Sequence, residues 1–262
     1  MHALTVAPTA ELIERYEAKY RIPPDLVAPI REAIQARCVP DEAGENGVYR
    51  IVSLYLDDAA RTLYYETQDR APRRYKLRIR RYSSGPVHLE VKRRIKGVIS
   101  KLRVAVPSEI WPAAFHDPRL LDRLSEKKRK TAYDFVNRCL LLDAQPAALV
   151  RYRREAWVST LDDYARITFD SQIEGRRPDG WHIPFADDPS RWLPVDHASR
   201  FGIGQSGVVL ELKCTALVPL WISDIVHRFK LFRTSFSKYS SALEAVDPQP
   251  APPTYVQARR LR

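Results

Sequence analysis

The chain has 262 residues, of which 45% are hydrophobic, so it is long enough for one large domain or two small ones with a buried core. Its formal net charge of +11 favours a polyanionic partner, such as nucleic acid, polyphosphate, a nucleotide or an acidic membrane surface. No apolar run approaches the roughly 20 residues that span a bilayer, and the N-terminus lacks the pattern of a secretory signal.

The first half of the chain reads as two strands, two helices and a three-stranded meander. In chain order these are a strand at 16–22, a helix at 25–36, a strand at 49–56, a helix at 59–69, and strands at 73–82, 87–96 and 98–107. Leu26, Ile30 and Ile34 recur at helical spacing, and the polar residues of the strands alternate with apolar ones. The last three strands are joined by very short turns, which predict antiparallel pairing.

The second half is predicted to be helical first and then mostly strands. In chain order we expect helix over 108–142, strands at 149–159 and 165–170, an irregular segment at 170–198, a strand at 208–215, a helix at 219–229 and a last short helix after the loop 232–239. Residues 127–130 carry four cations, which we interpret as a solvated helix face. We expect one domain over residues 1–246 and a flexible, Pro-rich basic tail over 247–262.

Strand phase decides which side chains share a face of the predicted sheet. Lys76, Arg78 and Arg80 point one way, and the aliphatic residues between them point the other. The same alternation returns in Leu89-Glu-Val-Lys92 and in Leu210-Glu-Leu-Lys213. A single strand of this kind has a solvent-exposed polar face, whereas several such strands facing one another form a cationic cavity.

The alternative is that the polar faces point outward and the leucines fill the interior. Apolar helices at 26–34, 135–142 and 221–229 are available to cover the outer face of the sheet, which favours apolar residues outside and charged residues inside. We therefore predict an α+β fold, in which an antiparallel β-barrel has flanking helices and a charged interior.

Several common functional motifs are absent or out of context. Gly202-Ile-Gly-Gln-Ser-Gly207 fits G-x-G-x-x-G but precedes a strand, so it does not indicate a dinucleotide site. There is no P-loop, no G-x-S-x-G and no metal-ligand spacing among the six histidines. The cysteines Cys38, Cys139 and Cys214 lie far apart, which predicts buried thiols in a reducing compartment, most simply the cytoplasm.

What remains is a set of paired polar positions on strands. They are Glu17/Lys19, Arg78/Arg80, Glu90/Lys92, Lys101/Arg103, Arg154, Arg166/Asp170 and Glu211/Lys213. Converging cations need a bound polyanion, and carboxylates among them suit a divalent metal that contacts phosphate oxygens. Cations and a metal-binding carboxylate are the features that phosphoryl transfer needs, because there the protein positions the phosphates and offsets their charge rather than supplying covalent chemistry.

These residues resemble the VTC domain of polyphosphate polymerases, within the triphosphate tunnel metalloenzyme (CYTH-like) superfamily. The resemblance runs from about residue 14 to residue 243. Its carriers are Tyr16-Glu-Ala-Lys-Tyr20, Lys76-Leu-Arg-Ile-Arg80, Leu89-Glu-Val-Lys92, Lys101-Leu-Arg103, Tyr152-Arg-Arg-Glu-Ala-Trp157, Arg166-Ile-Thr-Phe-Asp170, Leu210-Glu-Leu-Lys213 and Ser235-Phe-Ser-Lys-Tyr-Ser-Ser241.

The resemblance implies a triphosphate tunnel that transfers the γ-phosphate of ATP onto inorganic polyphosphate, with Mn²⁺ or Mg²⁺ as cofactor. The residues it assigns to catalysis are Arg78, Arg80, Lys92, Arg154, Arg166 and Lys238. Those it assigns to substrate binding are Lys19, Lys101, Arg103, Lys213 and Ser237. Glu211 and Glu90 are the expected metal ligands. Arg153 competes with Arg154 for the inward phase, and Arg154 is preferred because it directly precedes Glu-Ala-Trp.

The chain also departs from known members. It carries no inositol-phosphate-sensing domain or membrane helices, so coupling to translocation by this chain alone is not expected, although association with a membrane partner is left open. Glu17 and Lys19 form a shorter motif than the E-x-E-x-K of hydrolytic tunnel enzymes. The alternatives are a triphosphate or polyphosphate hydrolase of the same fold, or a non-catalytic polyanion-binding module. No specific nucleic-acid partner is expected, because the cations alternate with aliphatic residues rather than with exposed aromatic ones.

Overall fold

The computed structural model describes residues 15–82, 85–96, 98–162, 164–184, 189–196, 207–215 and 217–247. The strands are β1 (Arg15–Ile22), β2 (Cys38–Pro40), β3 (Val48–Asp57), β4 (Arg73–Arg81), β5 (Val87–Ile95), β6 (Val98–Val106), β7 (Gln145–Ser159), β8 (Ala165–Arg176), β9 (Leu193–Pro194) and β10 (Val208–Thr215). The α-helices are α1 (Val27–Gln35), α2 (Thr62–Gln68), α3 (Ala113–His116), α4 (Glu126–Leu142), α5 (Leu220–Arg228) and α6 (Lys238–Val246). Short 3₁₀ helices lie at Pro24–Leu26, Pro118–Arg123 and Pro189–Arg191.

The strands predicted from alternation are all present, and three other expectations need correction. The region 108–142 is not one helical run but α3, a 3₁₀ helix and α4, because Pro112 and Pro118 interrupt it. The short strands β2 and β9 were not expected. The segment after residue 170 is not irregular at first, since β8 continues to Arg176. Gln172 has a φ of 52°, and the pairing with β7 shifts nearby, so the alternation that marks a strand is lost there.

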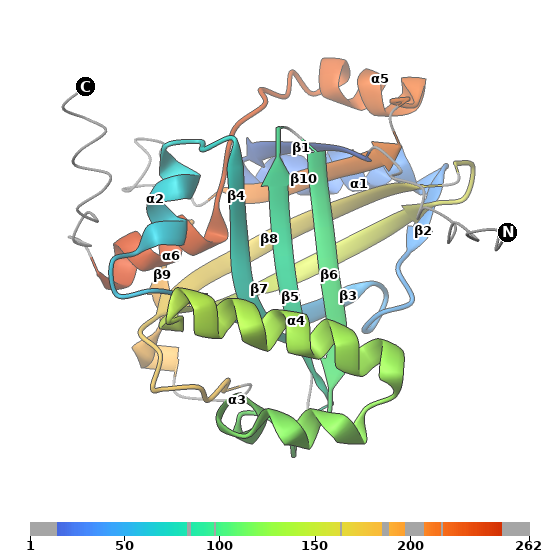
Figure 1. Ribbon diagram of the computed structural model, residues 1–262. Coiled ribbons are helices and arrows are strands. Elements are labelled where there is room, and N and C mark those ends of the chain that lie inside the picture. Colours follow the sequence, from blue (N-terminus) through green and yellow to red (C-terminus); the bar gives the residue numbers. More distant parts are fainter. Residues whose placement is uncertain are drawn as a thin grey trace, which may run out of the picture.

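Ten antiparallel strands form one sheet, and helices at its sides make the fold α+β. Its hydrogen-bonded order is β1-β10-β8-β7-β3-β4-β5-β6, with β2 on β7 and β9 on β8. In Figure 1 the strands β4, β5 and β6 cross in front of β7 and β8, so the sheet is strongly curved. Among the described residues β1 and β6 do not pair with each other, so the closed barrel predicted from the sequence is not confirmed.

The apolar faces of the strands point outward, against helices, as predicted. Leu77, Ile79 and Leu89 belong to one buried cluster with Phe135 and Val136 of α4, which lies across β4–β6 in Figure 1. A second cluster joins β1, β8 and β10 to α1 and α5. Burial of these side chains supplies most of the driving force for folding and leaves charged side chains of β1, β4, β5, β6, β7, β8 and β10 on the inner face.

Helix α6 is different, because it packs on the inner face of the sheet. Its Tyr239 stacks on Tyr55 with ring centroids 5.1 Å apart, and Tyr55 lies directly opposite Arg78 in the β3–β4 pair. Gly175 of β8 permits the close approach, since a Cβ there would lie 3.0 Å from Cα of Ala242. One end of the concave face is therefore filled by α6, and the N-terminus of this helix borders the remaining space.

Other predictions from the sequence concern the cysteines, the basic run on α4 and membrane spans. The three cysteines are free and buried. Lys127, Lys128 and Lys130 are exposed on α4. Within the described residues no helix is both long and apolar enough to cross a membrane. The lead-in before residue 15, residues 202–206 of the glycine motif and the tail beyond residue 247 lie outside the described residues, so the domain division stays a prediction.

Candidate phosphate-binding cavity

The inner face of the curved sheet encloses a cavity of about 870 Å³, here called the cationic cavity. Side chains from β1, β3, β4, β5, β6, β7, β8 and β10 line it, together with the segment that leads into α6. All the residues that the sequence assigned to the site, apart from Glu90, lie in its wall: Lys19, Arg78, Arg80, Lys92, Lys101, Arg103, Arg154, Arg166, Glu211, Lys213, Ser237 and Lys238. Of the two competing arginines, Arg154 lies in the wall, and Arg153 is exposed elsewhere.

Glu90 lies beneath the wall rather than in it. Its side chain has no exposed area and contacts four cations, which come from the neighbouring strands β4 and β6. The distances to a Glu90 carboxylate oxygen are 2.6 Å from Arg78, 2.8 Å from Lys101, 3.4 Å from Arg103 and 4.0 Å from Arg80. Burial alone would raise the pKa of Glu90, but these cations together hold the pKa well below its ordinary value. Glu90 is thus the fixed counter-ion of the half of the cavity that β4, β5 and β6 form.

Glu211 is the counter-ion of the half of the cavity that β1, β8 and β10 form, and unlike Glu90 it lies in the cavity wall. Its oxygens lie 2.7 Å from Lys213 Nζ, 3.5 Å from Lys19 Nζ, 3.6 Å from Lys238 Nζ and 3.8 Å from Arg154 Nη2. Burial opposes ionisation of this carboxyl, and the four cations outweigh it and lower its pKa well below the ordinary value.

Asp170 supports the Glu211 half from below. Arg154 donates two hydrogen bonds to its carboxylate, at 2.6 and 2.7 Å, and Lys238 Nζ lies 2.6 Å from Oδ2. This bidentate pairing fixes the plane of the Arg154 guanidinium. The pKa of Lys238 is raised, because the attraction of Asp170 and Glu211 exceeds the effect of burial. Lys238 is therefore a charged group in the cavity wall at neutral pH.

The sequence reasoning missed the polar groups that hold the arginines in place. Arg78 donates to the Tyr55 hydroxyl at 3.2 Å, and Arg80 donates to Ser53 and to the Tyr152 hydroxyl at 3.2 Å each. The signal was present in part, because Tyr152 lies two residues before Arg154 and so shares its face. Placing Ser53 and Tyr55 required the register of β3 on β4, which the sequence does not give.

Glu17, Lys76 and Arg166 complete the description of the wall. Arg166 pairs with Asp41 at 2.7 Å and donates to the Tyr49 hydroxyl at 3.1 Å. Glu17 accepts from Lys92 Nζ at 3.2 Å, which joins β1 to β5 across the space between them. Lys76, noted in the strand pattern but given no role, also lies in the wall.

The carboxylates do not converge into a metal site built by protein alone. Among the described residues no three His, Cys, Asp or Glu side chains gather closely enough to hold a metal ion. Glu90 is enclosed by cations and does not reach the cavity, so the geometry gives no support to its predicted role as a metal ligand. Glu211 is a hard oxygen donor at the cavity surface, and Mg²⁺ commonly takes one or two carboxylates with substrate phosphates as the other ligands. The donor chemistry therefore fits a metal that is shared between Glu211 and a phosphate.

Fold and site together define an antiparallel α+β protein whose curved sheet encloses a cationic cavity with built-in carboxylate counter-ions. The family model described as VTC domain matches residues 14–246, and the chain belongs to this family, which is associated with polyphosphate metabolism. A comparison with curated proteins gave no match. Among solved structures the chain is similar to the PH1819 protein from Pyrococcus horikoshii OT3, with 10% identity and a TM-score of 0.43 over 94% of this chain and 99% of that chain. We infer nothing about function from that weak likeness.

Proposed function

We propose that the protein is a metal-dependent polyphosphate polymerase that uses ATP and acts inside a tunnel formed by the curved sheet. A terminal oxygen of the polyphosphate acceptor attacks the γ-phosphorus of ATP, the bond from that phosphorus to the β,γ-bridging oxygen breaks, and ADP leaves. The acceptor oxygen is already anionic, so the protein needs no general base. Its residues position the two polyanions and offset their charge.

The observation that supports this proposal is the convergence of cations from seven strands and from the start of α6 on one cavity. Two polyanions repel each other, and a fixed array of guanidinium and ammonium groups offsets that repulsion without reorganising in the transition state. Arg78, Arg80 and Arg154 are each fixed by a carboxylate or by neutral donors and acceptors on the sheet, so their positions are set before substrate arrives.

Glu211 would hold Mn²⁺ or Mg²⁺ together with phosphate oxygens of the substrate. When bound, such a metal would offset charge on the transferring phosphoryl group.

The direct test is incubation of the protein with ATP and Mn²⁺ or Mg²⁺, followed by separate measurement of polymer, ADP and free phosphate. Polymer that forms in proportion to ADP supports the polymerase. ADP with free phosphate and without polymer would point to a hydrolase of the same fold, and no ADP would leave a polyanion-binding module.

Arg166→Ala sharpens this test, because Arg166 lies in the cavity wall and its contacts with Asp41 and Tyr49 lie in that wall rather than in the apolar cluster beneath α4. We expect turnover to be lost while the unfolding transition stays close to that of the parent. Lys128→Ala on α4 is the matched control, since that exposed cation lies in neither wall nor core. Full activity in Arg166→Ala would remove this residue from the site.

A further inference from the structure

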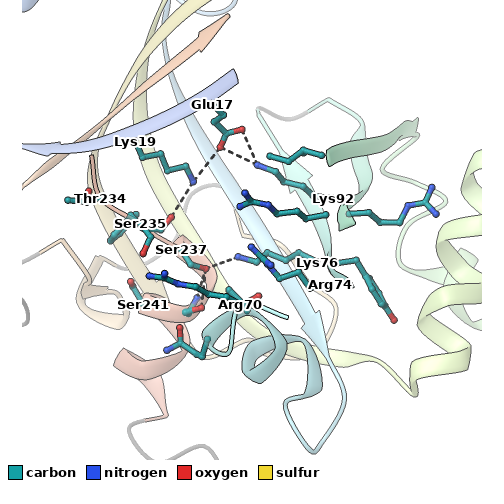
Figure 2. Close-up of a pocket in the computed structure, with 18 of the residues that line it drawn as sticks. Glu17, Lys19, Arg70, Arg74, Lys76, Lys92, Thr234, Ser235, Ser237 and Ser241 are labelled. Atoms are coloured by element: carbon teal, nitrogen blue, oxygen red, sulfur yellow. Dashed lines mark hydrogen bonds and ion pairs between the residues drawn. The ribbon is translucent and has the colours of Figure 1, made fainter. Parts of the chain in front are cut away.

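A second cavity of about 860 Å³ adjoins the cationic cavity. Lys19, Lys76, Lys92 and Ser237 lie in the walls of both, so these residues mark the junction between the two spaces. Figure 2 looks into the second cavity, where the Lys76 side chain points at Ser237 while Lys92 points at Glu17.

The cation row of β4 does not stop at the junction. Pairs that lie directly opposite each other on β4 and β5 include Lys76 with Lys92 and Arg74 with Arg94. Arg74 and Arg94 belong to the wall of the second cavity. Like charges directly opposite in a sheet are destabilising, so two consecutive pairs on one face point to a bound anion.

Lys76 has an unusual environment for a lysine at this junction. Its Nζ donates to Ser237 Oγ at 2.8 Å, and that hydroxyl also caps the N-terminus of α6 by accepting from Ser240 N at 3.3 Å. The positive end of a helix therefore lies beside a cation. Burial, followed by repulsion from Lys19, Lys92, Arg78 and Arg74, lowers the pKa of Lys76 well below its ordinary value.

The carboxylates of the site form ion pairs with cations other than Lys76. Glu90 contacts Arg78 and Lys101, Glu211 contacts Lys213 and Lys238, and Glu17 contacts Lys92 and Lys19. Lys76 differs from these cations because, within the part of the chain that the structure describes, its polar contact is a neutral hydroxyl rather than a carboxylate. A phosphate at the junction would supply the negative charge that this position lacks.

We propose that Lys76 binds the terminal phosphate of the acceptor polyphosphate at the junction of the two cavities, while the triphosphate of the nucleotide occupies the cationic cavity. This assignment rests on the proposed polymerase function and names the acceptor side of the same site. In this arrangement Ser237 positions Lys76, and Arg74 and Arg94 contact the polyphosphate where it continues into the second cavity.

The first test separates the two substrates kinetically. In Lys76→Met we expect the KM for a tripolyphosphate acceptor to rise about tenfold or more, the effect of losing a hydrogen bond to a charged group. The KM for ATP should stay within about twofold, and Lys76→Arg should recover most of the acceptor affinity. Equal changes in both KM values, or no change in either, would overturn the assignment.

The second test needs no turnover. A phosphate next to Lys76 raises its pKa, so tripolyphosphate binding should take up protons, seen by calorimetry at pH 8 in two buffers of different ionisation enthalpy. Lys92 and Lys101 also have lowered pKa values, so the informative quantity is the proton uptake that disappears in Lys76→Met. A protein that makes no polymer but loses this uptake in the variant would refute the polymerase and keep the anion site. Polymer synthesis with the same proton uptake in Lys76→Met as in the parent would support the polymerase and refute the anion site at Lys76.

Discussion

Replacing Glu90 with glutamine tests whether a buried carboxylate holds the cationic half of the cavity together. Glutamine keeps the volume of the side chain and removes its charge, so four cations within 4.0 Å are left facing no anion at this position. Removing one partner of a buried ion pair costs about 3–5 kcal/mol, because the remaining charges stay desolvated. A domain of ordinary stability has about 5–15 kcal/mol to lose, so the variant should fold but with a much lower urea midpoint.

The pH dependence gives the sign of the effect. Because the pKa of Glu90 is lowered in the folded protein, its contribution is fully present above the ordinary value of 4.5 and is lost as pH falls below it. The difference between parent and Glu90→Gln should therefore be largest near neutral pH and shrink in acid. Urea unfolding at pH 7 and at several values below 4.5 measures this difference.

Glu109→Gln makes the same chemical change at an exposed position and should shift stability by no more than about 0.5 kcal/mol. Tripolyphosphate should raise the unfolding temperature of Glu90→Gln more than that of the parent, because the cations of the variant lack an internal counter-ion. If Glu90→Gln were as stable as Glu109→Gln at pH 7, the counter-ion role of Glu90 would be refuted.

Three further predictions concern the metal, the pH profile and the core. Glu211→Gln should raise the Mn²⁺ or Mg²⁺ concentration needed for half-maximal turnover, and a metal titration like that of the parent would count against its role. Burial, partly offset by Glu90, lowers the pKa of Lys101 to about 8. Because an ammonium is charged below its pKa, kcat/KM should fall as pH rises above 8, and Lys101→Arg should move that fall to higher pH. Phe135→Ala should cost about 3–5 kcal/mol in urea unfolding by opening a cavity beneath α4, without changing the KM for ATP.

Strand phase was predictable wherever alternation was unbroken. The aliphatic and charged residues of β4 separate onto two faces in the sequence itself, and the amphipathic helix α1 indicated which side of the sheet is covered. The same reasoning failed beyond Asp170, where the left-handed Gln172 and the shifted pairing with β7 break the period of two.

Register was the part that the sequence could not supply. Glu90 and Glu211 sit in nearly identical local sequences, Leu-Glu-Val-Lys and Leu-Glu-Leu-Lys, and both were predicted to bind metal. They differ because β5 lies between β4 and β6, whose cations close over Glu90, whereas β10 lies between β1 and β8 and leaves Glu211 at the cavity surface. The packing of α6 on the inner face is a long-range contact of the same kind, hidden until strand order is known.

The pairing of Glu17 with Lys92 has a consequence for access to the interior of the cavity. The first and fifth strands meet there through two side chains at 3.2 Å rather than through a ladder of backbone hydrogen bonds. A partly exposed ion pair of this kind contributes about 0–1 kcal/mol, much less than a ladder of backbone hydrogen bonds. If the protein is the polymerase that we propose, this contact marks a seam in the wall, and a chain of phosphates would enter along its length instead of end first.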